Sequence, residues 1–296
     1  MPRLCFVQTL RATSWRDLAG LSLAALFLMS IIKTLAPDAA KPFLRNAGLT
    51  LPLLLLMAKD IAHAPDAWQR LRSAHARRAP WHARVTALLP PELVGMLRLD
   101  RLLWIACWRR LQRRSAPCAV PDGVGLTYLE RGAYGTATAV VFVSLLLELP
   151  VHVLLLNLFT KDADTLVMLH ALGAVAVLYT LVWLLGDRWH IGAGRHVVTD
   201  EALYLRVGAR VDGVLPLTAI ARMEMVDAPL PVWRRRHGVA RRDLLKVTPF
   251  DQPNCVLVLD DDARIDILHW QVKKRLPRYV FLYLDRPELL ATRLRR

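Results

Sequence analysis

The stretch Thr165–Gly186 constrains this chain most, because its 22 residues contain no Asp, Glu, Lys or Arg. A helix needs about 20 mostly apolar residues to cross roughly 30 Å of hydrocarbon. The stretch before it, Gly132–Thr160, carries one formal charge, Glu148, and only four residues separate the two stretches. The pair therefore predicts a transmembrane hairpin with a tight turn.

Two apolar segments precede this hairpin. Leu18–Ile32 is free of charged residues, whereas Asn46–Ala58 has only 13 residues and contains Pro52. On length alone, the second segment is equally consistent with a re-entrant or buried helix. A signal peptide is the alternative for the first segment, although its leader is long and Ala36-Pro37-Asp38 makes a poor cleavage site.

The distribution of positive charge chooses between these possibilities. Of the 40 Lys and Arg residues, 13 lie in residues 59–131 and 20 in residues 187–296, and the hairpin turn holds only Lys161. Cytoplasmic loops carry the excess of Lys and Arg. Four spans, with both termini and the central segment in the cytoplasm, satisfy this rule. We therefore expect an integral membrane protein with both termini in the cytoplasm.

The net charge of +15 does not by itself indicate a nucleic-acid partner, because the topology rule already explains where the basic residues lie. A hydrophobic content of 54% excludes a disordered chain, and four Cys in 296 residues do not make a disulfide framework. Nucleic acid is accordingly not an expected partner.

The central segment, residues 62–131, is predicted to form basic amphipathic helices and a linker. Pro91-Glu92 is a good helix start, and Pro117–Gly125 has the composition of a linker. Arginines that accompany Trp104 and Trp108 suit a membrane interface rich in anionic lipid. The alternative is that the apolar face packs against the rest of the protein and the arginines are solvated. The arginines concerned are Arg109, Arg110, Arg113 and Arg114.

After Arg188 the pattern changes to short alternating strands, such as Leu203–Gly208 and Cys255–Leu259. Asp285 and Pro287 mark the start of a closing helix, with Asp285 as its expected N-cap. The expected organisation is an N-terminal transmembrane pair (1–61), a cytoplasmic basic helical segment and linker (62–131), a transmembrane hairpin (132–186) and a cytoplasmic β domain (187–296).

Residues 190–296 resemble the bacterial PH-like domains that follow transmembrane hairpins. The late segments "PNCVLVL" and "LYLDRPELLATRL" are similar to the last strand and closing helix of such domains. The resemblance implies a small PH-like β-barrel or sandwich with a C-terminal helix, in a protein of a bacterial inner membrane. Together with the four expected spans, the predicted fold is an α+β membrane protein with four transmembrane helices followed by this domain. PH-like domains generally bind lipids, peptides or each other. The matching positions are Thr199, Leu203, Arg206, Gly208, Pro216, Leu217 and Ile220.

A basic loop departs from the PH-like pattern by its length and charge. It is expected either to contact anionic headgroups or a protein partner, or to be a solvated loop that keeps the domain on the cytoplasmic side. Its residues are Trp233, Arg234, Arg235, Arg236, Arg241 and Arg242.

Ionisable residues inside membrane spans are expensive and often functional. Glu148 and His152 are four residues apart and share a helix face, and His170 is expected at a similar depth in the return helix. These three residues predict either a proton-relay or metal-binding cluster, or a hydrogen-bonded contact that fixes helix packing.

No GxxxxGK[ST], HExxH, GxSxG or CxxC motif occurs in the sequence. Asp260–Asp262 lacks the spacing of a calcium loop and is interpreted as a turn. We therefore expect neither a cofactor nor a resident metal, and a non-enzymatic protein that presents a PH-like domain to a lipid surface, a protein partner or a second copy. The alternative is a small oligomeric transporter or membrane enzyme that uses Glu148, His152 and His170.

Overall fold

The computed structural model describes residues 13, 15–35, 37, 41–114, 121–159, 162–192, 194–260, 262–263 and 265–294. The basic leader before Thr13, linker residues 115–120, Lys161 and Asp261 are outside the described residues. The chain forms two compact units, Met1–Gly95 and Met96–Arg296.

The first unit is helical. Helix α2 spans Trp15–Leu35 and packs against α3, which spans Lys41–Ala76 and is followed by α4, Trp81–Leu88. The sequence predicts an apolar segment that ends near Ile61 and a separate amphipathic segment after it, whereas α3 is continuous over 36 residues. At 1.5 Å per residue α3 is about 54 Å long. Its apolar segment of 13 residues is one part of this longer helix.

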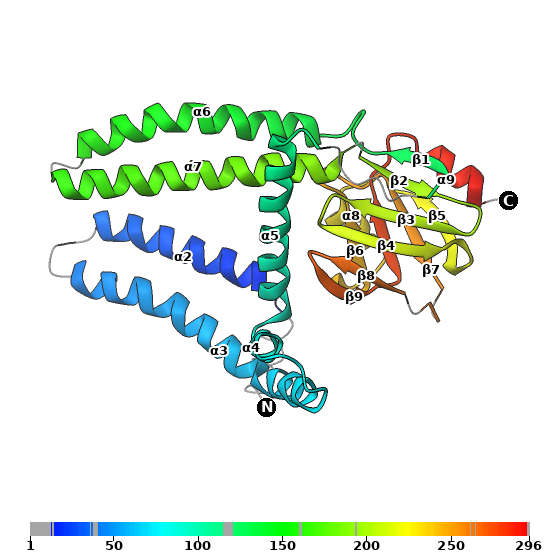
Figure 1. Cartoon of the computed structure of the whole chain (residues 1–296), viewed down its shortest axis with the longest axis horizontal. Helices are drawn as coiled ribbons and strands as arrows, with labels where there is room; N and C mark the ends of the chain where they lie inside the picture. Colours follow the sequence, from blue (N-terminus) through cyan, green and yellow to red (C-terminus); the bar gives the residue numbers. More distant parts are fainter. Residues whose placement is uncertain are drawn as a thin grey trace. The chain divides into compact units, whose positions relative to one another are not determined.

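The predicted hairpin is present as α6, Tyr134–Phe159, and α7, Ala163–Ile191, which lie side by side (Figure 1). The Asp162 carboxylate caps α7 by accepting a hydrogen bond from the Thr165 amide at 2.8 Å. Among the described residues, these two helices are long and apolar enough to cross a membrane. At most 6% of their most apolar stretches is buried inside the protein, unlike the core helix of a soluble domain. This supports an association with a membrane.

Helix α5, Pro91–Leu111, begins at the predicted proline.

The β domain contains two sheets, so the fold is α+β as predicted. The larger sheet has the order β1-β2-β3-β4-β8-β9: Val124–Thr127, Arg195–Val198, Ala202–Val207, Val211–Pro216, Asp266–His269 and Val272–Arg275. The smaller has the order β5-β7-β10-β6: Ile220–Met225, Cys255–Leu259, Tyr279–Leu282 and Leu244–Val247. The remaining elements are η2 (Leu217–Ala219), α8 (Leu230–Arg236), η3 (Arg241–Asp243) and α9 (Pro287–Leu294).

The β domain was predicted to begin at Asp187, and this boundary leaves out strand β1. β1 precedes the hairpin in sequence but pairs antiparallel with β2, with Leu126 opposite His196. The predicted linker therefore ends in a strand, because its last two residues, Val124 and Gly125, belong to β1. The Leu126 side chain is 1% exposed in the core, and this burial explains why the segment joins the sheet.

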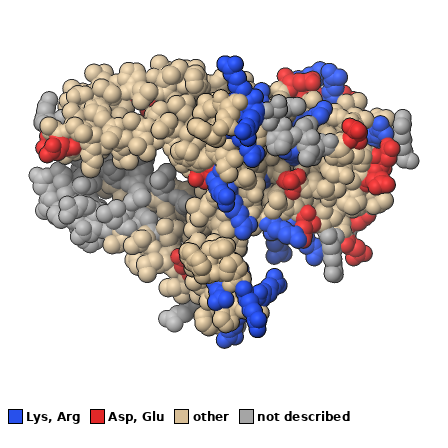
Figure 2. Space-filling model, in the orientation of Figure 1, with Lys and Arg blue, Asp and Glu red and all other residues tan. Residues whose placement is uncertain are grey.

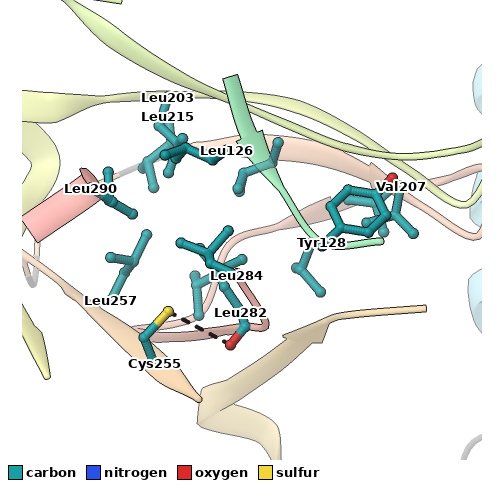
Figure 3. Close-up of a cluster of buried hydrophobic side chains, with 14 of the residues drawn as sticks. Leu126, Tyr128, Leu203, Val207, Leu215, Cys255, Leu257, Leu282, Leu284 and Leu290 are labelled. Atoms are coloured by element: carbon teal, nitrogen blue, oxygen red, sulfur yellow. Dashed lines mark hydrogen bonds between the residues drawn. The ribbon is translucent and has the colours of Figure 1, made fainter. Parts of the chain in front are cut away.

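The core of the β domain lies between the two sheets (Figure 3). Side chains from both sheets meet there, and the closing helix α9 contributes Leu290, which is fully buried. Among the strands that the structure describes, all pairs are antiparallel except the pairing of β10 with β6. The residues labelled in Figure 3 include Leu126, Leu203, Leu215, Leu257, Leu282, Leu284 and Leu290.

Candidate functional site

The β domain holds the start of helix α6 through two carboxylates. Asp285 accepts hydrogen bonds from the amides of Glu130 and Arg131, both at 2.9 Å, and Asp251 accepts one from the Ala133 amide. These amides belong to the turn that leads into α6, whose first residue is Tyr134, and negative charge is favourable near the start of a helix. The expected role of Asp285 as N-cap of the closing helix is therefore wrong, because its side chain is turned to the hairpin.

The end of helix α7 is held by a buried ion pair. Asp187, 6% exposed, accepts hydrogen bonds from Arg210 Nη2 at 2.5 Å and from the Tyr134 hydroxyl at 3.0 Å. The Arg210 guanidinium also lies over the rings of Phe250 and Trp270, at 5.3 and 5.7 Å from their centroids. We use the name hairpin base for the five side chains that hold the two ends of the hairpin: Tyr134, Asp187, Arg210, Asp251 and Asp285.

Sequence reasoning missed the hairpin base. In the sequence, Asp187 is the first charge after the apolar run, and Arg210 begins the strand-like segment Arg210–Leu217. Its partners come from distant parts of the sequence, so no spacing rule pairs them. The sequence contains one weak signal for this pair. Asp187 directly follows a predicted span, and a buried carboxylate needs a charged partner.

Helix α5 crosses α7 close to the hairpin base. Asp100 of α5 accepts hydrogen bonds from the Tyr179 hydroxyl at 2.7 Å and the Trp183 indole at 2.8 Å. The backbone of Leu103 lies so close to Gly186 that a side chain at that position would collide with it. The same Leu103 packs with Ala209 of the β domain. Packing of α5 against the protein, one of the two expected roles, is thus present on one side of the helix.

The other sides of α5 are exposed. Trp104, Trp108 and Leu111 are 45%, 63% and 63% exposed. The basic residues of α5 are Arg98, Arg101, Arg109 and Arg110, all exposed, and blue side chains gather in the middle of the view in Figure 2. Arg109 lies over the Trp189 ring at 5.8 Å from its centroid. The four arginines of the prediction, Arg109, Arg110, Arg113 and Arg114, are all exposed.

The basic loop has a buried anchor rather than an exposed tryptophan. Trp233 is 2% exposed, stacks on His237 with ring centroids 3.9 Å apart, and meets Phe281 edge-on at 5.0 Å. The expected contact of Trp233 with a membrane or partner is therefore wrong, because its ring fills a small core beside Val256. Burial of a large aromatic ring gives a large gain in hydrophobic free energy. The Trp233 ring therefore holds α8 against the sheet.

The arginines of this loop are more exposed than its tryptophan. Arg234 is half-buried, and Arg235, Arg236, Arg241 and Arg242 are exposed. Arg236 is 3.7 Å from Asp227 and Arg242 is 3.8 Å from Asp243, and both pairs are solvent-exposed. Exposed ion pairs of this kind contribute little to stability, so these side chains can exchange partners at low cost.

Within the hairpin, two of the three predicted residues meet. The rings of His152 and His170 lie edge to face, with centroids 6.1 Å apart, and His152 Nε2 is 3.4 Å from the Leu169 carbonyl. Glu148 is exposed, and neither imidazole forms a hydrogen bond or ion pair with it. In the described part of the chain, no group of three or more His, Cys, Asp or Glu residues is arranged to hold a metal ion.

The β domain also buries titratable groups. Burial lowers the pKa of His196 to about 4, and its Nδ1 accepts a hydrogen bond from the Arg206 amide at 3.0 Å. Burial raises the pKa of Cys255 to about 12. Both groups are neutral at pH 7, so the Cys255 thiol is a core side chain rather than a nucleophile.

Comparisons with family models, curated proteins and solved structures give no significant match. The function must therefore be argued from the hairpin base, α5 and the exposed arginines.

Proposed function

We propose that this protein is a non-enzymatic integral protein of a bacterial inner membrane that presents a cytoplasmic PH-like domain to a lipid surface or a protein partner. The observation that carries this proposal is the hairpin base. Asp285 and Asp251 hold the start of α6, and Arg210 holds Asp187 near the end of α7. A mobile tether needs none of these contacts, whereas a domain presented in one orientation does.

The chain path supports the same conclusion. β1 enters the larger sheet just before the hairpin, and β2 enters it just after, paired with β1. The sheet thus binds both ends of the hairpin directly. The β domain is therefore fixed beside the membrane whenever the hairpin is inserted.

Four spans with both termini in the cytoplasm complete the proposal. The hairpin supplies two helices that are long and apolar enough to cross, and α2 and α3 would supply the others. Helix α2 has 21 residues, about the length that a span needs. In α3 the uncharged apolar segment Asn46–Ala58 has only 13 residues, so residues on both sides of it would have to enter the membrane. The positive charge in residues 59–131 and 187–296 favours the cytoplasm for both segments.

The PH-like assignment draws support from the two sheets around one core and from α9, which closes that core with Leu290. The parallel pairing of β10 with β6 is a feature that the resemblance did not imply. The exposed arginines of α8 and η3 supply the surface on which a lipid or protein partner would bind.

Orientation is tested by cysteine labelling in intact and permeabilised cells, after Cys5 and Cys118 are changed to Ser. A membrane-impermeant maleimide should label Asp164→Cys from outside, and Arg235→Cys only after permeabilisation. Labelling of Arg235→Cys in intact cells would refute the cytoplasmic assignment.

The interaction surface is tested by in-cell crosslinking and pull-down of the full-length protein. Changing Arg234, Arg235 and Arg236 to Ala should remove the crosslinked species. A matched control changes Lys273, Lys274 and Arg275 to Ala. These residues are also basic and exposed on the same domain. Equal crosslinking of both variants would contradict the proposal.

The alternative of a small oligomeric transporter or membrane enzyme rests on His152 and His170. Their ring contact is the observation in its favour. Asparagine at both positions separates the two functions: a transporter or enzyme would lose its activity while remaining folded, whereas our proposal predicts that only hairpin stability changes.

A further inference from the structure

Helix α5 has three different sides. Leu99, Leu103 and Ala106 are fully buried. A second side carries exposed apolar residues at helical spacing, which we call the apolar stripe: Leu97 (56% exposed), Trp104 (45%), Trp108 (63%) and Leu111 (63%). The third side is basic and exposed, with Arg98, Arg101 and Arg109, and the exposed Arg113 lies in the turn that follows the helix.

The contacts of α5 show which way the apolar stripe faces. Trp104 of the stripe is next to the Tyr179 ring, with centroids 6.3 Å apart, whereas Leu103 is opposite Gly186. Tyr179 precedes Gly186 by seven residues, which is about 10 Å deeper into the apolar run. The stripe is therefore on the side of α5 that faces the apolar part of the hairpin.

The opposite side of α5 faces the β domain. The Leu102 carbonyl is 3.4 Å from Nε2 of His190, which follows the apolar run, and Leu99 packs in a cluster with Trp270 and Ala209. The helix therefore separates two environments: the apolar part of the hairpin is on its stripe side, and the water-soluble domain is on the other.

The level of α5 along the hairpin is equally informative. α5 runs across α7 rather than alongside it (Figure 1), and it crosses where the charge-free run Thr165–Gly186 ends. If α7 spans the bilayer, this is the level at which hydrocarbon gives way to headgroups. A helix that lies across a span at this level lies in the plane of the interface.

We propose that α5 is an interfacial helix of the cytoplasmic leaflet, with its apolar stripe among the acyl chains and its arginines on the phosphates of anionic lipids. Tryptophan at the boundary and Arg on an adjacent side are the composition of such helices. Both the stripe's continuity with the apolar hairpin surface and the charge of the basic side favour lipid as the occupant. This inference rests on the proposed function, since it requires the hairpin to cross the membrane.

Spin-label depth measurements on the full-length protein in phosphatidylglycerol-containing nanodiscs test this placement. Single labels are introduced as Trp108→Cys, Gln112→Cys, Leu172→Cys and Gln252→Cys, after Cys5 and Cys118 are changed to Ser. Cys107 and Cys255 are buried and are left in place. Oxygen concentrates in hydrocarbon and a nickel chelate stays in water, so their relative effects on each label report depth.

We expect the label at position 108 to resemble that at position 172 in the hairpin, with high oxygen and low nickel accessibility. The label at Gln112, beside the basic side, should be reached by nickel, as should the control on the β domain at Gln252. Nickel access at 108 equal to that at 252 would overturn the inference. Protection of 108 from both reagents would also overturn it, because a protein, such as a second copy, would then cover the stripe.

The label at 172 separates the two levels of failure. If 172 is in hydrocarbon and 108 is in water, the hairpin crosses and only the interfacial placement of α5 is wrong. If 172 is itself in water, the hairpin does not cross and the proposed function fails as well.

The arginine side is tested by the anionic lipid retained after release from nanodiscs, measured by native mass spectrometry. Changing Arg98, Arg101, Arg109 and Arg113 to Gln should reduce the retained lipid. The control changes Lys273, Lys274 and Arg275 to Gln, which should leave it unchanged. Equal retention in both variants would overturn the assignment of these arginines to lipid phosphate.

Discussion

Asp187 and Arg210 are the residues on which the hairpin base most depends. Both side chains are largely removed from water, with exposures of 9% and 12%, and each is the other's charge partner. A buried pair of this kind contributes little beyond an apolar pair of the same size, but breaking it leaves one charge without compensation. The consequences of its removal can therefore be predicted.

Asp187→Asn should lower the free energy of unfolding by about 3–5 kcal/mol, because the Arg210 guanidinium then remains buried without its partner. Thermal unfolding in nanodiscs measures this change. The control Asp212→Asn alters an exposed carboxylate of the same domain and should change stability by less than about 0.5 kcal/mol. Equal effects of the two substitutions would show that the pair does not hold the hairpin.

Gly173 gives a test of the histidine contact inside the hairpin. A methyl group at this position would lie 2.5 Å from His152 Nε2, so Gly173→Ala should destabilise the hairpin by about 1–3 kcal/mol. His152→Ala in the same chain should relieve the loss. Gly135→Ala is the matched control, since nothing lies within 4 Å of its new methyl group and it should be neutral or stabilising. A neutral Gly173→Ala would contradict the contact.

His196 predicts an acid-sensitive β domain. Its folded pKa of about 4 is below its unfolded value of about 6.5, so only the unfolded chain takes up the proton between these values. The stability from neutral His196 is complete above about pH 6.5 and is lost as the pH falls toward 4, with about 2 kcal/mol lost at pH 5. Chemical unfolding at pH 7 and pH 5 measures this loss. His196→Gln should abolish the part of this pH dependence that His196 causes. If the pH dependence of stability is unchanged in this variant, other groups cause it.

At the scale of elements, β1 shows how a strand is hidden from sequence reasoning. Val124–Thr127 is only four residues long and follows a linker composition, so periodicity alone does not reveal it. Its partner β2 lies beyond the whole hairpin. By contrast, most strands of residues 195–282 were recognisable because alternation and turn residues recur there at short intervals, although β6 and β9 were not predicted.

A soluble β domain should therefore require residues from both sides of the hairpin. A fragment of residues 187–296 lacks Leu126 and Tyr128, which are both 1% exposed in the core, and should be unstable or aggregated. A fragment that joins residues 121–133 to 188–296 by a short Gly/Ser linker should unfold cooperatively. Circular dichroism and thermal unfolding of the two fragments make the comparison. Equal stability of both would show that β1 is dispensable.

Helix α8 shows a second limit of pattern reasoning. A tryptophan next to three arginines is typical of a membrane-contacting loop, yet the Trp233 ring packs against Phe281 and His237. The helical turn of α8 directs this one side chain inward and Arg235 and Arg236 outward. Which residue of a mixed segment faces the core depends on the sheet beneath it, and no local pattern contains that information.

At the scale of the whole molecule, the second compact unit buries hydrophobic cores of its own. The three clusters of buried hydrophobic side chains in the described residues all lie within residues 96–296. The second unit thus contains its own cores and the complete hairpin base. It does not need the first unit to bury them.

A chain that begins at Pro90 should accordingly retain the fold of the second unit. It keeps Pro91, where α5 begins, and both helices of the hairpin. Its unfolding temperature in nanodiscs should match that of the full-length protein for the β domain, and Asp187→Asn should lower both equally. A truncated chain that fails to fold would show that residues 1–89 are needed for the second unit.

The sequence by itself determined the hairpin, the α+β class, the start of α5 and most strands, because each depends on a local run or period that no distant residue alters. Only the tertiary structure decided the partners of Asp187 and Asp285, the inward position of Trp233 and the place of β1 in the larger sheet. These features depend on which distant segments meet. Burial of a charge or a ring is fixed by its neighbours in space, and the hairpin sets those neighbours by bringing residues 124–134 against residues 187–285.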